Sequence, residues 1–351
     1  IGSFETISDS LFNLNDIDSG ELGVQVATTG INGSFTLNDV PSGRYVLTAA
    51  ISRHLTGQDT VVVLPGTDVV AVQPTLDGGG VDWSELLAGD VAGFTDSTGA
   101  SVPDNFIDSS DLSAIEAALF ERVGDANYNT YADVNRDSVV NATDKDYAAT
   151  NQTTDTGAAG SIRPVLPHFK VALPDGNNAD ALVTLTNLPE GEIRAGESFD
   201  VTVQVSGARA VRTYELHLGY DADKLAFEGL MSNGTLMSSY LTTMSGKLED
   251  DGVGLVNSIL GRTPVGASGE GTLATVRFRA IGRATQTDLV LSDAMLIDVE
   301  HESATPKVEG KATITLSKEA IRYHDVDGKE LPGLSLARVA PKADFNDFLA
   351  F

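Results

Sequence analysis

The chain has 351 residues, of which 41% are hydrophobic, so it predicts roughly two to four folded domains rather than a disordered polymer. Fifty acidic residues against 23 basic ones give a formal net charge of −27, which argues against nucleic acid and anionic lipid as partners. The absence of cysteine excludes disulfide bonds and thiol chemistry, and no apolar run reaches the ~18 residues of a membrane span.

Residues 1–78 predict a small β-domain. Asn32-Gly33 is a strong hairpin signal, and the segment 37–47 has the pattern of a strand, a Pro-Ser-Gly turn and a second strand. Two more strands are expected at 61–64 and 69–72. The stretch GSFTLNDVPSGRYVLTA resembles the CnaB-like or carboxypeptidase-regulatory sandwich. That resemblance leaves the opening strand to the irregular segment upstream or to another chain.

Residues 82–151 form a different, helical module with 14 acidic and 3 basic side chains. Leu112, Ile115 and Leu119 recur at helical spacing after an Asp-rich loop. A second loop followed by a short helix is expected at 133–150. The sequence therefore predicts a module of two acidic loops, each followed by a helix.

The second loop, residues 133–144, has the spacing of a calcium loop. A twelve-residue loop wraps calcium when oxygen ligands occupy its positions 1, 3, 5, 7, 9 and 12. In this order the ligands are Asp133, Asn135, Asp137, the carbonyl of Val139, Asn141 and Asp144. Val140 at position 8 is the apolar residue that fixes such a loop to the core. Position 6, where glycine is preferred, is Ser138.

The first loop is less regular. Its matching ligands at positions 5, 7, 9 and 12 are Asp104, the carbonyl of Phe106, Asp108 and Asp111, with Ile107 at position 8. Positions 1 and 3 would then be Ala100 and Val102, which have no side-chain oxygen. If Asp90 is position 1 instead, ten residues are inserted before Asp104, and Asp96 supplies a ligand from within the insertion.

Two such loops in about 70 residues resemble a dockerin. The resemblance implies that calcium, the expected cofactor, folds the module, and that loop positions 10 and 11 face a protein partner. Those positions are Ser109, Ser110, Ala142 and Thr143. Helix N-capping is an equally good explanation of the two serines.

Residues 152–178 have the composition of a linker, and strand signals resume in 179–317. Seven strands are expected, at 182–185, 199–205, 214–218, 255–260, 273–278, 289–291 and 312–316. This spacing favours a β-sandwich. The stretches 195–203, 220–229 and 271–280 resemble, in order, three stretches of the cohesin family, which binds dockerins. The tail, 318–351, ends in an apolar cluster that would pack on its own sandwich or on a neighbour.

The fold class expected is mainly β, with two β-sandwich domains flanking a small α-helical calcium-loop module. The five histidines are scattered and no nucleotide-binding or hydrolase motif occurs, so an enzyme is not expected. The function expected is a non-catalytic, calcium-dependent assembly subunit, extracellular or at the cell surface, that polymerises head to tail. A cellulosome-like adaptor for hydrolases and a carbohydrate-binding adhesin are the alternatives. Trp83, the one tryptophan, lies outside the cohesin-like region and argues against a sugar-binding face there.

Overall fold

The computed structural model describes residues 11–16, 25–28, 37–50, 52–55, 57–64, 87–95, 97, 101–152, 163–164, 177–232, 234–249, 251–261, 266–282 and 286–320. The chain divides into two units, residues 1–140 with 147–171, and residues 141–146 with 172–351. Several predictions lie outside the described residues: the hairpin at Asn32-Gly33, the strand at 69–72, Asp96, most of the linker, and the tail beyond 320. Among the described residues, no helix has the length and apolar character needed to cross a membrane.

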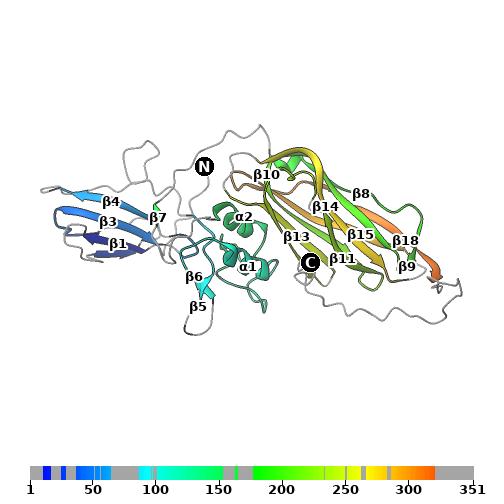
Figure 1. The fold of residues 1–351 in the computed structure, drawn as a ribbon, viewed down its shortest axis with the longest axis horizontal. Coiled ribbons are helices and arrows are strands. Elements are labelled where there is room, and N and C mark those ends of the chain that lie inside the picture. The colour runs from blue at the N-terminus through cyan, green and yellow to red at the C-terminus, as the bar shows by residue number, and fades with distance from the viewer. Residues whose placement is uncertain are drawn as a thin grey trace. The chain divides into compact units, whose positions relative to one another are not determined.

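The N-terminal residues form a five-stranded sheet in the order β2-β1-β3-β4-β7 (Figure 1). Its strands are β1 (Leu11–Asp16), β2 (Gln25–Thr28), β3 (Gly43–Ala50), β4 (Gly57–Val63) and β7 (Arg163–Pro164). The strand predicted after the Pro-Ser-Gly turn is confirmed as β3, where Tyr45 and Leu47 are buried. β1 comes from the irregular upstream segment and pairs with both β2 and β3, so this chain supplies that strand itself.

The module after this sheet contains a hairpin and two helices. They are β5 (Gly93–Thr95), β6 (Ser101–Pro103), α1 (Ser109–Ala118) and α2 (Ala142–Asn151). The helical spacing of Leu112, Ile115 and Leu119 is confirmed, because all three side chains are buried. Ile107 and Val140, the apolar residues at position 8 of the two loops, are fully buried as well.

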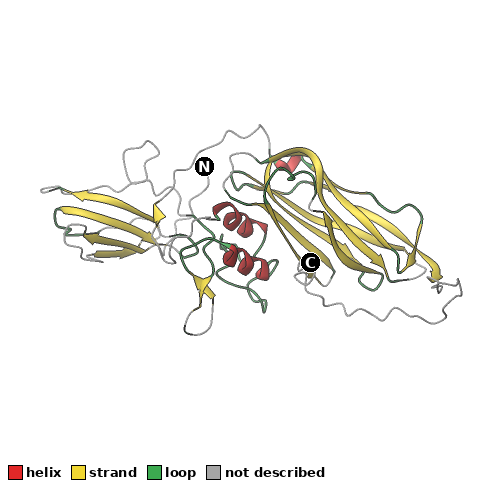
Figure 2. Cartoon of the chain, viewed as in Figure 1, coloured by secondary structure: helices red, strands yellow, loops and turns green. Residues whose placement is uncertain are grey.

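The second unit is a β-sandwich, and Figure 2 shows how strongly strands dominate it. Its strands are β8 (Leu182–Thr186), β9 (Glu192–Ala195), β10 (Ser198–Tyr220), β11 (Leu225–Ser232), β12 (Thr242–Glu249), β13 (Gly252–Ile259), β14 (Ala267–Ala280), β15 (Gln286–Asp298), β16 (Ser303–Ala304), β17 (Lys307–Glu309) and β18 (Lys311–Ala320); a 3-10 turn, η1 (Asn178–Asp180), precedes them. The mainly β fold class is thus confirmed.

β10 connects the two layers of the sandwich. Its first half pairs with β8 and β14, and its second half pairs with β13 and β15. Gly207 and Ala210 have positive φ angles of 73° and 47° at the change of partner, where the register is also irregular. The strands predicted at 199–205 and 214–218 are therefore two halves of one bent strand, a correction that the local sequence pattern did not indicate.

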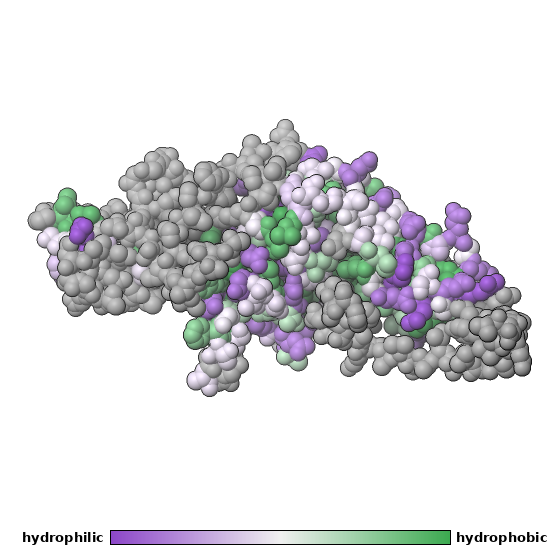
Figure 3. Space-filling view, viewed as in Figure 1, coloured by the Kyte–Doolittle hydropathy of each residue, from purple (hydrophilic) through white to green (hydrophobic). Residues whose placement is uncertain are grey.

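The interior between the layers is apolar. Phe278 on β14 is fully buried and its ring contacts those of Phe199, Tyr220 and Phe227. β12 was not predicted, because it pairs only with β13 at the edge of the sheet and its sequence TTMSGKLE is largely polar. Hydrophilic side chains are numerous on the face drawn in Figure 3, and hydrophobic ones form small patches between them.

Candidate calcium loops and docking surface

The second loop closes around the carboxylate of Asp133. Oδ1 accepts a hydrogen bond from the Asp137 N–H at 3.1 Å, and Oδ2 accepts one from the Ser138 N–H at 3.1 Å. The Asp137 N–H also donates to Asn135 Oδ1 at 3.0 Å, and the Val139 N–H donates to Asp137 Oδ1 at 2.9 Å. The oxygens predicted at positions 1, 3 and 5 are thus drawn to the inner side of one turn.

The end of the second loop is held by two short contacts at the start of α2. The Asn141 N–H donates to Asp144 Oδ2 at 2.8 Å, and the Thr143 N–H donates to Asn141 Oδ1 at 2.7 Å. At position 6, Ser138 adopts φ 77°, the left-handed conformation for which glycine is preferred. The loop therefore keeps the turn of a calcium loop without the glycine, at some cost in backbone strain.

The first loop repeats these contacts with Asp90 in the place of Asp133. Asp90 accepts hydrogen bonds from the N–H groups of Asp104 at 3.0 Å and Asn105 at 2.9 Å, and the Phe106 N–H donates to Asp104 Oδ1 at 3.0 Å. Asn105 at position 6 has φ 67°, as Ser138 does in the second loop. Of the two registers left open by the sequence, this geometry matches the one with Asp90 at position 1. The inserted residues include the hairpin β5–β6, and Asp96 lies outside the described residues.

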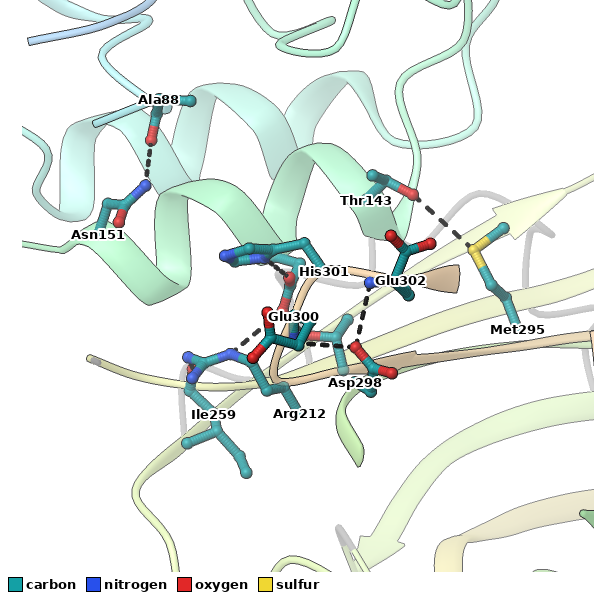
Figure 4. Close-up of polar contacts among 12 residues, drawn as sticks. Ala88, Thr143, Asn151, Arg212, Ile259, Met295, Asp298, Glu300, His301 and Glu302 are labelled. Atoms are coloured by element: carbon teal, nitrogen blue, oxygen red, sulfur yellow. Dashed lines mark hydrogen bonds and ion pairs between the residues drawn. The ribbon is translucent and has the colours of Figure 1, made fainter. Parts of the chain in front are cut away.

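The segment carrying Asp90 packs closely against the part of α2 that belongs to the same unit. The Asn151 side chain donates to the Ala88 carbonyl at 2.9 Å (Figure 4). Gly89 has φ +120°, and a Cβ added there would lie 2.7 Å from the Ala148 Cα. A side chain at residue 89 would therefore move Asp90 away from Asp104 and Asn105.

Asp111 ends the first loop and joins three backbone segments. Its carboxylate accepts hydrogen bonds from the N–H groups of Val91 at 2.7 Å, Ala92 at 2.9 Å and Asp108 at 2.7 Å. The Asp108 side chain accepts from the Ser110 N–H at 2.7 Å and is the N-cap of α1. The capping role considered for Ser109 and Ser110 thus belongs to Asp108, and both serines are exposed.

The charge at the first loop fits a divalent cation. Burial raises the pKa of Asp90 to about 7, and the nearby charge of Asp111 adds to this shift. Burial also raises the pKa of Asp111 to about 6. In the part of the chain that the structure describes, no three carboxylate or imidazole groups converge as a metal site by themselves. A calcium ion in either loop would therefore draw on asparagine and main-chain oxygens too, which suits its preference for ~6–8 oxygens.

The first residues of α2 lie against the β-sandwich of the second unit (Figure 4). The Ala142 N–H donates to Glu215 Oε2 at 2.8 Å, and Thr143 Oγ1 donates to the Met295 sulfur at 3.9 Å. Glu215 lies on β10 and Met295 on β15, which are neighbouring strands. A carboxylate at the first N–H groups of a helix also interacts favourably with the helix dipole.

Lys145 and Asp146, which follow Ala142 and Thr143 in α2, also contact the sandwich through their side chains. The Lys145 ammonium donates to the Thr243 carbonyl at 3.2 Å, to Ser245 Oγ and to the Val256 carbonyl at 3.5 Å. Asp146 Oδ1 accepts from Thr213 Oγ1 at 2.5 Å, and its Oδ2 lies 2.6 Å from His301 Nδ1. Both side chains are fully buried. Neither residue was among the predicted partner contacts, although Lys145 is one of only 3 basic residues in the acidic module.

His217 gives the sandwich a pH dependence. Its ring lies 3.0 Å from Glu215 Oε1 and 3.1 Å from Glu249 Oε2. Burial alone would lower the pKa of His217, but the hydrogen bonds and charges of the two glutamates outweigh it and raise the pKa to about 10. Because an unfolded histidine titrates near 6.5, the folded chain holds this proton more tightly. This contribution is complete below about pH 6.5 and is lost as the pH rises toward 10.

We therefore expect the free energy of unfolding of the sandwich to fall by about 1–2 kcal/mol between pH 6.5 and pH 9.5, a value reduced for the partial solvent exposure of the ring. Urea denaturation at both pH values measures it. His217→Gln, which cannot take up a proton, should flatten this slope; an unchanged slope in the variant would assign the pH dependence to other groups.

Two acidic loops with the same hydrogen-bond pattern, each leading into a helix, and a β-sandwich that contacts the start of the second helix are features of interaction modules. Residues 183–314 match the family of the cohesin domain, and residues 102–146 match that of the dockerin type I domain. The chain thus contains a cohesin domain and a dockerin domain, non-catalytic modules typical of cellulosome-type assembly between proteins.

Solved cohesin structures are similar to this chain over part of its length. A non-cellulosomal cohesin from the archaeon Archaeoglobus fulgidus is 20% identical, with a TM-score of 0.31 over 39% of this chain and 90% of that one. A type II cohesin in complex with an X-dockerin from Acetivibrio cellulolyticus is 16% identical, with a TM-score of 0.34 over 39% and 99%. A type I cohesin–dockerin complex from Clostridium thermocellum is 10% identical, with a TM-score of 0.31 over 40% and 97%. No curated protein matches the chain.

Proposed function

We propose that this chain is a non-catalytic, extracellular assembly subunit whose dockerin module binds the cohesin domain of another copy of the same chain. The observation that carries this proposal is the contact of residues 141–146 with the sandwich, in which Ala142 donates to Glu215 and Asp146 meets Thr213 and His301. The chain thus holds a ligand segment together with a surface that accepts it. Two different surfaces that recognise each other between copies make a heterologous contact, which gives rings or open filaments.

The same contacts serve a closed monomer and an open assembly. In a closed monomer the segment 141–146 lies on the sandwich of its own chain, and in an assembly it lies on the sandwich of the next copy. Exchange of an identical element between copies needs no new contact. Protein concentration therefore decides between the two forms, because only the assembly gains from mass action.

Calcium would fold the docking module in this proposal. The second loop would hold an ion through Asp133, Asn135, Asp137, the Val139 carbonyl, Asn141 and Asp144, and the first through Asp90, Asp104, the Phe106 carbonyl, Asp108 and Asp111, with Asp96 as a further ligand. Calcium supplies positive charge that offsets the repulsion among these carboxylates. The protein itself supplies the closed turns and the orientation of α2, so that loss of calcium loosens the docking surface.

The proposal divides the chain into five parts, and the N-terminal part would act as a spacer. We assign the docking module to 82–151, the linker to 152–178, the cohesin domain to 179–317 and the tail to 318–351. A CnaB-like sandwich at 1–78 would act as a spacer, with the sheet β2-β1-β3-β4-β7 as part of it.

Light scattering after size-exclusion chromatography, at increasing protein concentration with calcium or with chelator, tests the proposal. We expect the mean mass to rise with concentration in calcium and to return to the monomer in chelator. A monomer at every concentration in both conditions, also after refolding at high concentration, would contradict self-assembly. If such a monomer captured foreign cohesins or dockerins, the adaptor would replace this proposal, and sugar binding by the sandwich would favour the adhesin.

A further inference from the structure

We infer that Lys145-Asp146, at the start of α2, is the specificity determinant by which this chain recognises its own sandwich, and that it allows one docking orientation only. This inference rests on the proposed function and names the residues that carry it. It also distinguishes the second calcium loop from the first, although the two loops share their hydrogen-bond pattern.

Lys145 fits a subsite lined by oxygen atoms. The subsite lies on the edge hairpin β12–β13, where Lys145 meets the Thr243 carbonyl, Ser245 Oγ and the Val256 carbonyl. A lysine is rarely buried unless its ammonium is satisfied by hydrogen bonds, and here several oxygens converge on it. An apolar residue at 145 would remove the ammonium that these three oxygens share.

Asp146 fits a second subsite of opposite charge. Arg212 on β10 is 1% exposed, and its Nε lies 3.5 Å from Asp146 Oδ1. The guanidinium is held in place by Nη2, which donates to the Ile259 and Gly261 carbonyls at 2.9 Å each. Because a buried guanidinium is costly without a counter-ion, the carboxylate of Asp146 near the start of α2 stabilises Arg212. The carboxylate at 146 is therefore part of the fit between the helix and the sandwich.

The turn after β15 positions His301 for the same carboxylate. His301 has φ 63°, an uncommon conformation for a residue other than glycine, and its N–H donates to the Asp298 carbonyl at 3.1 Å. The Asp298 side chain accepts hydrogen bonds from the N–H groups of Glu300 at 2.9 Å and Glu302 at 3.1 Å, which fixes the turn (Figure 4). Strained backbone of this kind is concentrated at functional sites.

The first loop lacks both charged residues. The positions that follow its last ligand, Asp111, are Leu112 and Ser113, where the second loop has Lys145 and Asp146 after Asp144. Leu112 is buried within its own unit, and Ser113 Oγ donates to the Ser109 carbonyl at 2.7 Å. If the module turned so that α1 replaced α2, neither residue could serve the subsites, and Arg212 would lose its counter-ion. Unpaired buried groups of this kind reject the wrong orientation.

Two variants of the full chain test the recognition step. Asp146→Ala keeps the sandwich surface but loses the carboxylate, and His301→Asp keeps α2 but sets a second carboxylate beside Asp146. We expect each variant alone to remain unassembled in calcium. Their mixture should form a complex, because the intact α2 of the His301→Asp chain meets the intact sandwich of the Asp146→Ala chain.

Sedimentation of a fluorescently labelled Asp146→Ala chain against increasing His301→Asp chain measures the affinity. We expect the mixed pair to bind at least about 30-fold more tightly than either variant binds itself, the lower end of the effect of breaking a buried charge pair. Because the mixture restores binding, misfolding of the single variants would not explain their failure. A mixture that stays unassembled while the wild type assembles would overturn the inference and leave the proposed function intact. If the wild type also stayed monomeric, both would fall.

Ser113→Ala is the matched control for orientation, because Ser113 occupies in the first loop the position of Asp146 in the second. Each substitution is introduced into the His301→Asp chain, which contributes α2 to the mixed pair and cannot close on its own sandwich. We expect Ser113→Ala to change its affinity for the Asp146→Ala chain less than about twofold, and Lys145→Met to weaken that affinity at least about tenfold. If Ser113→Ala weakened the mixed pair as strongly as Lys145→Met, the module would use both orientations.

Discussion

Asp133→Ala is expected to weaken calcium binding by the second loop strongly and to loosen the start of α2. Asp133 is 3% exposed and accepts hydrogen bonds from the N–H groups of Asp137 and Ser138 and from Tyr128 Oη at 2.6 Å. Alanine removes the ligand at position 1 and removes the acceptor that these donors share, while the Asp137 N–H keeps its second acceptor, Asn135 Oδ1. We expect the affinity for calcium to fall by about 100-fold or more, since loss of a supporting contact around a ligand alone costs about 10–100-fold.

Calorimetric titration with calcium and thermal melting in calcium and in chelator measure this effect. The wild type should lose a melting transition of the module in chelator, whereas the variant should lack it in both conditions. Asp125→Ala removes the same charge from the turn between the loops, where Asp125 Oδ2 accepts from the Arg122 N–H, and should leave calcium binding unchanged. Equal calcium affinity in Asp133→Ala and the wild type would refute the assignment of the second loop.

Asp111→Ala has the largest expected effect on the first loop. Its carboxylate is buried and accepts three backbone hydrogen bonds, from Val91, Ala92 and Asp108, which hold the segment before the β5–β6 hairpin against α1. Alanine leaves three N–H groups without this acceptor. Since each charge-assisted bond of this kind contributes about 1.5–3 kcal/mol and their effects are not fully additive, we expect the module to lose about 3–5 kcal/mol of stability.

Hydrogen exchange of residues 87–152 in the full chain measures the loss. Exchange of the Val91, Ala92 and Asp108 N–H groups should accelerate first, and the change should persist in chelator because these bonds lie within the protein. Ser110→Ala, an exposed substitution in the same turn of α1, is the control and should leave protection unchanged. If the acceleration appeared only with calcium present, Asp111 would act chiefly as a ligand.

Local spacing in the sequence was sufficient to predict both helices and to single out residues 133–144 as a calcium-loop candidate, whose hydrogen-bonded turn the structure shows. All predicted ligands of that loop lie within twelve consecutive residues, so their geometry follows from one turn of backbone. The two helices follow in the same way from capping residues and apolar spacing around Ile115. Alternation of apolar residues likewise marked the strands β8, β10, β13, β14, β15 and β18 of the sandwich, whereas β9, β11, β12, β16 and β17 were not predicted. β12 was missed because an edge strand needs little apolar surface.

The register of the first loop and the bend of β10 depend on contacts between residues that are far apart in the sequence. Asp90 reaches Asp104 and Asn105 across an inserted hairpin, and spacing alone left two registers open. The bend of β10 depends on which strands pair with each half.

By itself, then, the sequence determined the class of the dockerin and cohesin modules, because apolar periodicity and ligand spacing are local properties of the chain. Only the tertiary structure decided that Lys145 and Asp146 meet Ser245, Thr213 and His301, which lie 67 to 155 residues further along the chain. Such a match depends on the burial of charges by surfaces that meet only after folding, and a charged residue in a sequence does not reveal whether folding will bury it.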